Sequence, residues 1–457
     1  MNSFFEDLAL SRQLAEGIRD AGGRAFYVGG FVRDGIMGIE CKDIDIEVYG
    51  LEPARLREVL SAYGEVYDRG ASFGVLGLRH SDIDIAMPRT ESRTGAKHTD
   101  FDVSVNPFLD PKEAARRRDF TVNAMMQDVL TGEILDFYGG RQDLQDKVIR
   151  CVHPDTFIED ALRVFRAAQF AARLNAYIHP DTRALCATMD VTELSVERIF
   201  AETEKALIKA DKPSVYFREL AAMGHLKEFF PEVEKMIGLE QNPKFHPEGD
   251  VFEHTMLTLD EAAKLKGRSA WPLGFMFSAL AHDIGKIVAT EVQEDGRITA
   301  YGHEVLGLGM VEEQMRRITN HEKLIKYVIN QTELHMRPNM LFGAKSKKKK
   351  TRQLFDMSVS PNDLILLSRA DASGKLDEPY REENEAWLRE RLEDYHQRLK
   401  LPMVSGQDLI AAGLKPDKNF SALIQRARML HFAGLDKKNA LHQVLSEVQE
   451  MQENLQK

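Results

Sequence analysis

The stretches FYVGGFVRD (residues 26–34) and KDIDIEVYG (residues 42–50) decide the fold. Polar and apolar residues alternate strictly in the second stretch, so a strand would place Asp43, Asp45 and Glu47 on one face and the apolar residues on the other. Carboxylates at positions i and i+2 lie a few ångströms apart and repel each other unless a cation sits between them. Hard oxygen ligands suit Mg²⁺, whereas an isolated acidic strand face is more often only solvated.

A glycine turn precedes this acidic strand. Gly29 and Gly30 follow the apolar FYV run, and the predicted helix begins with Arg33 and Asp34 near its start. Glycines let a backbone approach a phosphate, and a helix N-terminus with an arginine nearby favours anions. A phosphate cradle ahead of a metal-binding pair is the layout expected of a nucleotidyltransferase.

Five motifs in order resemble the polymerase-β-like superfamily, and specifically its bacterial class II branch of CCA-adding enzymes and poly(A) polymerases. The motifs are GGFVRD with DID (29–34 and 43–45), RRDFTVNAM (117–125), DFYGGRQDL (136–144), EDALRVFRAAQFAARL (159–174) and SVERIFAETEKAL (195–207). Five ordered motifs are a specific signal, whereas a glycine pair with a DxD alone is weak. The resemblance covers most of the chain.

The resemblance implies that Asp43 and Asp45 bind the metal ions for catalysis, which we take to be Mg²⁺. A second strand, SDIDIAMPRTE (81–91), repeats the acidic pattern, and the family's third carboxylate corresponds to Asp84. We interpret Asp82 and Glu47 as solvated side chains. By resemblance, the residues around the triphosphate and ribose are Gly29, Gly30, Arg33, Asp34, Arg117, Arg118, Asp119 and Asn123.

A second polar group is expected on the helix beginning near Glu159, where Asp160, Arg163 and Arg166 would share one face. A carboxylate only accepts hydrogen bonds and a guanidinium only donates them. Cytosine and adenine both show an exocyclic amine beside a ring-nitrogen acceptor, so an Asp–Arg pair matches them and rejects guanine and uracil. An isolated DxxR would be an ordinary surface ion pair, but in the family the matching pair selects CTP and ATP. Gln169 replaces the usual arginine, which either weakens a triphosphate contact or shifts the nucleotide preference.

The segment PRTESRTGAKHTDFDVSVNPF (88–108) is polar, contains glycine and lacks periodicity, which predicts a mobile loop. In the family a flexible loop here supports the switch to A addition, and enzymes that add only CC lack it. The segment therefore favours full CCA activity. Poly(A) polymerases of this branch usually carry a strongly basic tail, whereas the C-terminal part of this chain is mixed in charge.

A separate set of histidines and aspartates follows in the order H…HD…H…H…D. The segment PLGFMFSALAHDIGK (272–286) predicts a core helix ending in the HD pair. This order and the HDxGK core resemble the HD phosphohydrolase superfamily, which implies a metal-bound water that attacks a phosphate. Mixed ligation of this kind suits Mg²⁺ or a divalent transition metal rather than structural zinc. The ligands implied by the resemblance are His254, His282, Asp283, His303, His335 and Asp371.

The bulk composition is compatible with this interpretation. The 457 residues are too many for one core, and a hydrophobic share of 43% is ordinary for a globular protein. Three cysteines far apart indicate no disulfide framework, and no apolar run is long enough to span a bilayer. We expect a cytoplasmic protein that does not bind membranes.

The predicted fold class is α+β: a polymerase-β-like nucleotidyltransferase head followed by an all-α neck, an HD domain and a helical tail. The predicted function is addition of C, C and A to tRNA from CTP and ATP, with an HD activity on RNA ends or nucleotides. Alternatives are an A-adding or CC-adding enzyme, a poly(A) polymerase, or an HD phosphohydrolase whose head only binds RNA. The oligomeric state is left open. The expected boundaries are 1–140 (head), 141–243 (neck and body), 244–375 (HD domain) and 376–457 (tail).

Overall fold

The chain folds into two compact units. The computed structural model describes residues 4–39, 41, 43–69, 74–93, 101–376 and 380–456. The first unit consists of Met1–Ala210 and Val215–Glu228, and the second of Asp211–Ser214 and Phe229–Lys457.

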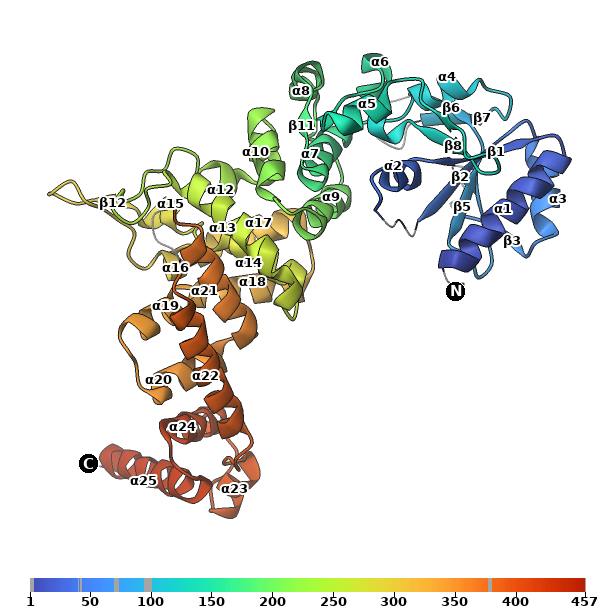
Figure 1. The fold of residues 1–457 in the computed structure, drawn as a ribbon. Coiled ribbons are helices and arrows are strands. Elements are labelled where there is room, and N and C mark those ends of the chain that lie inside the picture. Colours follow the sequence, from blue (N-terminus) through green and yellow to red (C-terminus); the bar gives the residue numbers. More distant parts are fainter. Residues whose placement is uncertain are drawn as a thin grey trace. The chain divides into compact units, whose positions relative to one another are not determined.

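A mixed seven-stranded sheet forms the centre of the first unit, with strand order β3-β4-β5-β2-β1-β8-β9 (Figure 1). Neighbouring strands are antiparallel except for β2 and β5, which are parallel. β2 is therefore an interior strand. The strands are β1 (Arg24–Val28), β2 (Ile44–Tyr49), β3 (Val66–Asp68), β4 (Val75–Leu78), β5 (Ile83–Ala86), β8 (Met126–Asp128) and β9 (Ile134–Leu135).

One face of the sheet is covered by α1 (Phe4–Asp20) and α3 (Pro53–Ser61), which contact each other (Figure 1). Leu14 of α1, Leu60 of α3 and Ile46 of β2 belong to one buried hydrophobic core. The alternation predicted for the DID strand is confirmed on this face, because Ile44, Ile46 and Val48 all enter that core.

The other face of the sheet carries a smaller apolar cluster. Tyr49 at the end of β2 packs there with Phe26 of β1, Met126 of β8 and Ala114 of α4 (Pro111–Arg116). Both faces of β2 are thus partly covered, which explains why its burial extends beyond the apolar positions.

The predicted loop at 88–108 contains two strands, so the expectation of a loop is wrong for residues 89–93 and 101–105. β6 (Arg89–Arg93) pairs antiparallel with β7 (Phe101–Val105) in a separate two-stranded ribbon. Residues 94–100, where the remaining loop was predicted, lie outside the described residues.

The rest of the first unit is mainly helical. α7 packs against α9, and β10 and β11 form a short parallel pair of strands. The elements are α2 (Gly30–Ile36), the 3-10 turn η1 (Thr121–Asn123), α5 (Gly140–Gln145), β10 (Val148–Ile149), α6 (Pro154–Phe157), α7 (Arg163–Leu174), β11 (Tyr177–Ile178), α8 (Pro180–Ala187), α9 (Val196–Lys209), α10 (Ser214–Ala222) and α11 (Leu226–Phe229).

The second unit is almost entirely helical, apart from the small hairpin of β12 (Glu291–Val292) and β13 (Ile298–Thr299). Its first helices are α12 (Pro231–Glu234), α13 (Val251–Leu265), the 3-10 turn η2 (Lys266–Arg268), α14 (Pro272–Ala281), α15 (Lys286–Ala289), α16 (His303–Leu306), α17 (Leu308–Ile318), α18 (Glu322–Leu334), α19 (Met336–Gly343), α20 (Lys348–Met357) and α21 (Pro361–Ser373). α13 packs against both α14 and α21. The predicted α+β class with a helical C-terminal region is confirmed.

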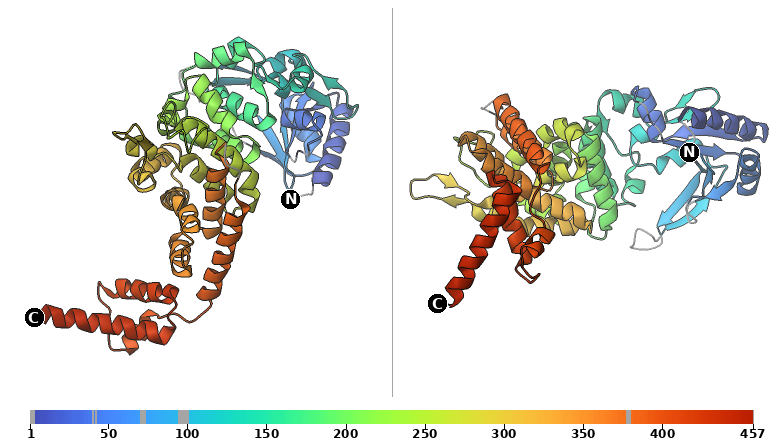
Figure 2. Two further views of the ribbon diagram at one scale, coloured as in Figure 1. Left: turned by 60° about the vertical axis from the view of Figure 1, so that its left-hand side comes forward. Right: turned by 90° about the horizontal axis from the view of Figure 1, so that it is seen from below.

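The last helices continue the second unit. They are α22 (Glu382–Leu399), α23 (Gly406–Ala411), α24 (Phe420–Ala433) and α25 (Lys437–Gln456). α24 and α25 contact each other (Figure 2, left) and share an apolar core with α23 that includes Leu409 and Val444. Among the described residues, no helix is both long and apolar enough to cross a membrane.

Candidate functional site

Two acidic strands of the first unit bring their aspartates together. In the parallel pairing of β2 with β5, Asp45 lies directly opposite Asp84. Asp43 immediately precedes β2 and is exposed. The isoleucines flanking Asp45 and Asp84 are buried, so the hydrophobic core fixes this register. The predicted carboxylates therefore gather near the starts of two neighbouring strands.

The carboxylate of Asp45 lies in surroundings that disfavour its charge. Burial raises its pKa, and the nearby carboxylates of Asp84 and Asp43 raise it further, while Arg118 acts in the opposite direction. Asp84 also forms an ion pair with Arg69. A divalent cation between Asp45 and Asp84 would relieve the repulsion through the oxygen ligands that Mg²⁺ prefers. The donor set fits a magnesium site.

The glycine turn after β1 reaches this acidic pair. Gly29 has a φ of +66°, a conformation that disfavours any side chain. A methyl group on Gly29 would lie 3.6 Å from Arg118 Nη1 and 3.9 Å from Asp45 Oδ2. A methyl group on Gly30 would lie 3.5 Å from Arg33 Nη2. The predicted glycine turn thus adjoins one carboxylate and two guanidinium groups, the surroundings that a metal-bound phosphate needs.

Arg33 and Asp34 are buried, with 2% and 3% of their surfaces exposed. Arg33 donates from Nε to Asp34 Oδ1 at 2.7 Å and from Nη1 to Asn123 Oδ1 at 2.6 Å. Arg173 of α7 donates to the other oxygen of Asp34 at 3.0 Å. Burial lowers the pKa of Arg33, and the charge of Asp34 opposes that effect. These side chains therefore fix the helix after the glycine turn against α7.

Glu47 is buried, which contradicts the expectation of a solvated side chain. It accepts hydrogen bonds from Arg117 Nη2 at 3.0 Å and from the Tyr49 hydroxyl at 2.9 Å, and Arg118 Nη2 lies 3.5 Å away. Burial acts to raise the pKa of Glu47, but the two arginines outweigh it and the pKa is lowered. Glu47 thus anchors both arginines beside the acidic pair. Asp82 is exposed, as expected.

Asp119 and Arg166 form a second polar connection to α7. Arg166 donates from Nε to Asp119 Oδ2 at 2.7 Å and lies 3.7 Å from Glu202 of α9. Asn123 donates to the other oxygen of Asp119 at 3.1 Å. Burial acts to raise the pKa of Asp119, but Arg166 and Asn123 outweigh it and the pKa is lowered. One continuous network thus contains Asp34, Arg33, Asn123, Asp119 and Arg166.

The pair expected to select the base is arranged differently from the prediction. α7 begins at Arg163, so Asp160 lies in the preceding turn and not on the helix. Asp160 Oδ1 accepts from the Leu162 N–H at 3.1 Å, a local hydrogen bond that competes with helix formation. Arg198 Nη2 also donates to both oxygens of Asp160, at 3.1 and 3.0 Å. The shared helix face predicted for Asp160, Arg163 and Arg166 is therefore wrong for Asp160.

Two further side chains of α7 bear on this prediction: Arg163 is half-buried and Gln169 is buried. Arg163 donates to the backbone carbonyls of Thr156 at 2.6 Å and Arg117 at 2.7 Å. Gln169 is 2% exposed, and among the described residues its Nε2 has no hydrogen-bond partner. The position where an arginine is usual is thus buried, and the effect of Gln169 on nucleotide preference stays a prediction.

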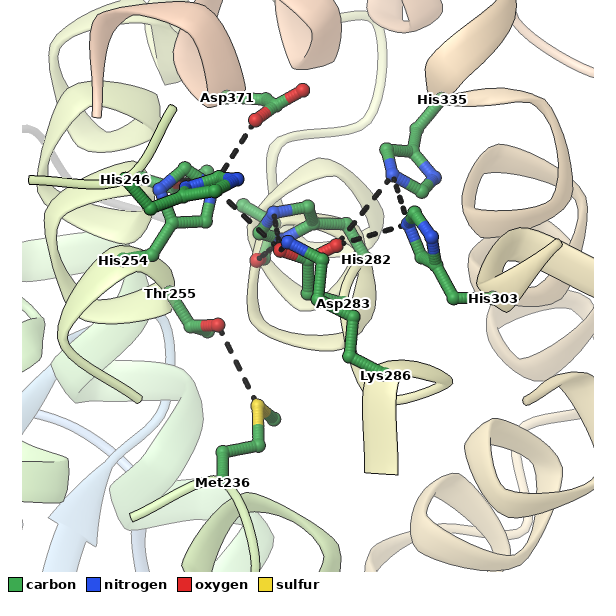
Figure 3. A network of polar contacts seen from close by, with 12 residues as sticks. Met236, His246, His254, Thr255, His282, Asp283, Lys286, His303, His335 and Asp371 are labelled. Atoms are coloured by element: carbon green, nitrogen blue, oxygen red, sulfur yellow. Dashed lines mark hydrogen bonds and ion pairs between the residues drawn. The ribbon is translucent and has the colours of Figure 1, made fainter. Parts of the chain in front are cut away.

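In the second unit four histidines surround one aspartate (Figure 3). Measured to the carboxylate oxygens of Asp283, the Nε2 atoms of His254, His282, His303 and His335 lie at 3.6, 3.2, 3.1 and 3.8 Å. α13 and α16 carry two of these histidines, and the other two follow the last residues of α14 and α18. Residues spread over more than eighty positions of the sequence thus converge on one buried point.

Each of these histidines is oriented by a hydrogen bond at Nδ1. In His282, His303 and His335, Nδ1 contacts the carbonyl oxygen of the residue three positions earlier, at 2.8, 2.9 and 2.7 Å. In His254 it contacts Glu248 Oε1 at 2.8 Å. These oxygens only accept, so each Nδ1 carries a proton, and a ring in its neutral form then presents the lone pair of Nε2. The Nε2 atoms of His303 and His335 face each other at 3.3 Å.

Facing lone pairs around a carboxylate are the arrangement that a bound cation requires. Among the described residues, Nε2 of the buried His282 has no hydrogen-bond partner. Asp371 Oδ1 lies 3.1 Å from His254 Nε2, beside the cluster. Nitrogen and oxygen donors of this kind fit divalent transition metals or Mg²⁺. Two groups that share Asp283 could each hold an ion: His254, His282 and Asp283, and Asp283, His303 and His335.

The prediction from sequence missed two members of the cluster, His246 and Glu248. Glu248 Oε1 accepts from Nδ1 of both His246 and His254, each at 2.8 Å. The Glu248 side chain is fully buried. Burial acts to raise its pKa, but the hydrogen bonds from His254 and His246 outweigh it and bring the pKa to about 2. Both residues lie in NPKFHPEGD (242–250), the segment that contains the predicted boundary between the neck and body (141–243) and the HD domain (244–375).

Lys286 and Gly285 complete the HDxGK segment. Lys286 Nζ lies 2.7 Å from Asp283 Oδ2 and donates to Gln241 Oε1 at 2.6 Å. A methyl group on Gly285 would lie 1.9 Å from the carbonyl oxygen of His303, so only glycine permits this approach of the two segments. A cavity of about 740 Å³ adjoins the cluster and is lined in part by Gln241 and His246.

The acidic strand pair and the glycine turn lie in residues that match the class of poly(A) polymerase head domains. The family described as "Poly A polymerase head domain" matches residues 25–150, and "Probable RNA and SrmB- binding site of polymerase A" matches residues 177–237. The chain is 33% identical over 374 residues to a "Multifunctional CCA protein" of Actinobacillus pleuropneumoniae serotype 5b (strain L20), an alignment that covers 79% of this chain and 88% of the relative. The chain therefore belongs to the family of multifunctional CCA proteins, the bacterial class II CCA-adding enzymes.

Solved structures share the fold along nearly the whole chain. The Bacillus stearothermophilus CCA-adding enzyme in complex with CTP superposes with a TM-score of 0.65 at 19% identity, covering 99% of this chain and 100% of the other. The Thermotoga maritima CCA-adding enzyme complexed with tRNA gives a TM-score of 0.59 at 20% identity, covering 98% and 99%.

Proposed function

We propose that this protein adds C, C and A to the 3′ ends of tRNA from CTP and ATP without a nucleic-acid template. The observation that carries the proposal is the register of β2 and β5, which sets Asp84 opposite Asp45 beside the turn at Gly29. The name of the relative, "Multifunctional CCA protein", supports the same activity. The two solved structures with this fold contain CTP and tRNA, respectively.

Asp43, Asp45 and Asp84 would hold two Mg²⁺ ions in this reaction. Bound metal would neutralise the triphosphate and lower the pKa of the RNA 3′-hydroxyl, which attacks the α-phosphate while pyrophosphate leaves. Arg118 lies where it can neutralise phosphate charge, since it adjoins both Gly29 and Asp45. Glu47 holds Arg118 and its neighbour in position.

Asp160 and Arg163 would select the base. The carboxylate would accept from the exocyclic amine of cytosine or adenine, and the guanidinium would donate to the adjacent ring nitrogen. In the structure Arg198 donates hydrogen bonds to the carboxylate of Asp160, and the guanidinium of Arg163 donates to two backbone carbonyls. The incoming base would therefore exchange with these contacts, and guanine or uracil would leave both groups unpaired.

A second activity is supported by the histidine cluster, and we propose that it is a metal-dependent phosphohydrolase of the HD type. Its ligands would be His254, His282, Asp283, His303 and His335, with Asp371 beside them. Bound metal would lower the pKa of a water that attacks the phosphate. Lys286 Nζ, 2.7 Å from Asp283, would help to neutralise the substrate. We expect activity on 2′,3′-cyclic phosphates, 2′-nucleotides and phosphate esters at RNA ends or on nucleotides.

The division into a head (1–140), neck and body (141–243), HD domain (244–375) and tail (376–457) belongs to this proposal, as does a cytoplasmic location. The test is incubation of tRNA lacking its 3′ CCA with each labelled nucleotide. Incorporation of A alone, of CC alone or of a long A tract would instead support the narrower relatives or a poly(A) polymerase.

The two sites can be tested against each other. Asp45→Ala should abolish nucleotide incorporation and leave hydrolysis of a cyclic phosphate, whereas Asp283→Ala should do the reverse. Hydrolysis without any incorporation by the unmodified protein would favour an HD phosphohydrolase whose head only binds RNA. Loss of both activities in either variant would show that the sites are not independent.

A further inference from the structure

One histidine of the cluster is oriented differently from the other three. The Nδ1 atoms of His282, His303 and His335 are held by backbone carbonyls three residues earlier in the chain. That of His254 is held by the side chain of Glu248. A backbone carbonyl carries no net charge, whereas a carboxylate does. His254 is therefore the one ring among these four whose orientation depends on a charged side chain.

The contact between Glu248 and His254 is enclosed by protein. Both side chains have no exposed surface. The ring of His246 lies 4.8 Å from that of His254, in an edge-on arrangement, and its Nδ1 donates to the same carboxylate oxygen at 2.8 Å. Two N–H donors thus converge on Oε1 of Glu248 and hold the carboxylate beside His254.

We propose that Glu248 is a positioning residue for the metal site, which strengthens His254 as a ligand. With its proton held at Nδ1 by a carboxylate, the ring presents only Nε2 to the metal, and the negative charge makes that nitrogen more basic. His246 supports the carboxylate from the side of the cavity of about 740 Å³, which it lines. The inference rests on the proposed phosphohydrolase site and adds a residue that the sequence pattern did not indicate.

The test measures metal binding directly and uses the full-length protein carrying Asp45→Asn, so that the head contributes little to the signal. Metal is removed with a chelator, Mn²⁺ is added in steps, and the free ion is followed by electron paramagnetic resonance. Asp283→Ala identifies the part of the binding that belongs to the cluster. The Kd of that part is then compared for Glu248→Ala, Glu248→Gln and the matched control Glu240→Ala, whose side chain is exposed.

Removal of an oriented partner of a ligating histidine costs about 10- to 100-fold in metal affinity, and we expect this loss for Glu248→Ala. Glu248→Gln keeps an oxygen that can accept both N–H groups but removes the charge, so its Kd should fall between those of Glu248→Ala and the unmodified protein. Glu240→Ala should bind Mn²⁺ like the unmodified protein. Circular dichroism and the thermal unfolding midpoint of the metal-free proteins report whether each variant folds. If Glu248→Ala does not fold, the test relies on Glu248→Gln.

Unchanged Mn²⁺ affinity in folded Glu248→Gln and Glu248→Ala would overturn the role of Glu248 and leave the proposed phosphohydrolase site intact. A different outcome would affect both: if Asp283→Ala removes no Mn²⁺ binding, the cluster is not a metal site and the inference falls with it. Reduced affinity with an unchanged unfolding midpoint of the metal-free protein would support a positioning role over a purely structural one.

Discussion

Asp84 of β5 lies directly opposite Asp45 of β2 in a parallel strand pair. The two aspartates are 39 positions apart in the chain, and each stands between two buried isoleucines that anchor its strand in the same core. The relationship is therefore set by hydrophobic packing on one face of the sheet, while the carboxylates occupy the other face.

Replacing Asp84 by asparagine should remove a metal ligand without changing its size. We expect the rate of CTP incorporation to fall at least about 100-fold. Removal of a side chain that only orients a metal ligand already costs up to about 100-fold in metal affinity or activity, and Asp84 would be a ligand itself. Asp82→Asn is the matched control, because Asp82 is exposed two positions earlier on the same segment. Equal rates for both variants would show that Asp84 is not a ligand.

Gly29→Ala should impair nucleotide binding. A side chain at φ +66° and ψ −130° costs roughly 1–3 kcal/mol, and the methyl group would lie within 4 Å of both Arg118 Nη1 and Asp45 Oδ2. We expect a higher KM for CTP and a lower melting temperature. Gly35→Ala, at a position with no atom within 4 Å of the added methyl, should leave KM unchanged. A KM that is equally unaffected in both variants would exclude a role for the Gly29 turn in binding.

Arg166→Gln should destabilise the first unit in a pH-dependent way. Arg166 helps to keep the pKa of Asp119 low, so the stability that this carboxylate contributes is present above its unfolded pKa of about 3.9 and lost as pH falls through the lower folded value. Without Arg166, burial raises the folded pKa, and protonation of Asp119 then favours the folded state. The loss, about 3 kcal/mol near pH 7, should therefore shrink toward pH 4.

Urea unfolding of the unmodified protein and of Arg166→Gln at a series of pH values measures this effect. Adding Asp119→Asn to both proteins should abolish the pH dependence of their difference. A difference that stays constant between pH 7 and pH 4 would contradict the coupling between these two side chains.

Gly285→Ala should disrupt the histidine cluster without touching a ligand. The added methyl would lie 1.9 Å from the carbonyl oxygen of His303, so the two segments must separate. We expect a loss of about 1–3 kcal/mol in the free energy of unfolding, together with weaker Mn²⁺ binding. Gly267→Ala, with no atom within 4 Å of its methyl, provides the control. Tight Mn²⁺ binding by Gly285→Ala would argue that His303 is not a ligand.

The period-two pattern of KDIDIEVYG predicted the core face of β2, because Ile44, Ile46 and Val48 are buried. The pattern could not predict the state of Glu47. Its partners Arg117 and Arg118 come from 70 positions later in the chain, and the covering of the second face by Phe26 and Met126 depends on the whole sheet. Local periodicity reports one covered face, not two.

Three other differences between the prediction and the structure have separate causes. Asp160 caps a turn through the Leu162 N–H, and this bond outweighs the helical spacing that suggested a shared face with Arg163. β6 (RTESR) is entirely polar, so no hydrophobic alternation marked it, whereas the apolar–polar alternation of FDVSV in β7 was a strand signal that the interpretation as a loop overlooked. Glu248 was hidden in a segment rich in proline and glycine, where the pairing with His254 becomes visible only once α13 has formed.

The most direct test of the central claim is incorporation of labelled nucleotides into tRNA that lacks its 3′ CCA. The proposed function predicts two C residues from CTP followed by one A from ATP, no incorporation from GTP or UTP, and loss of all incorporation in Asp45→Ala. Failure of the unmodified protein to incorporate either CTP or ATP would contradict it.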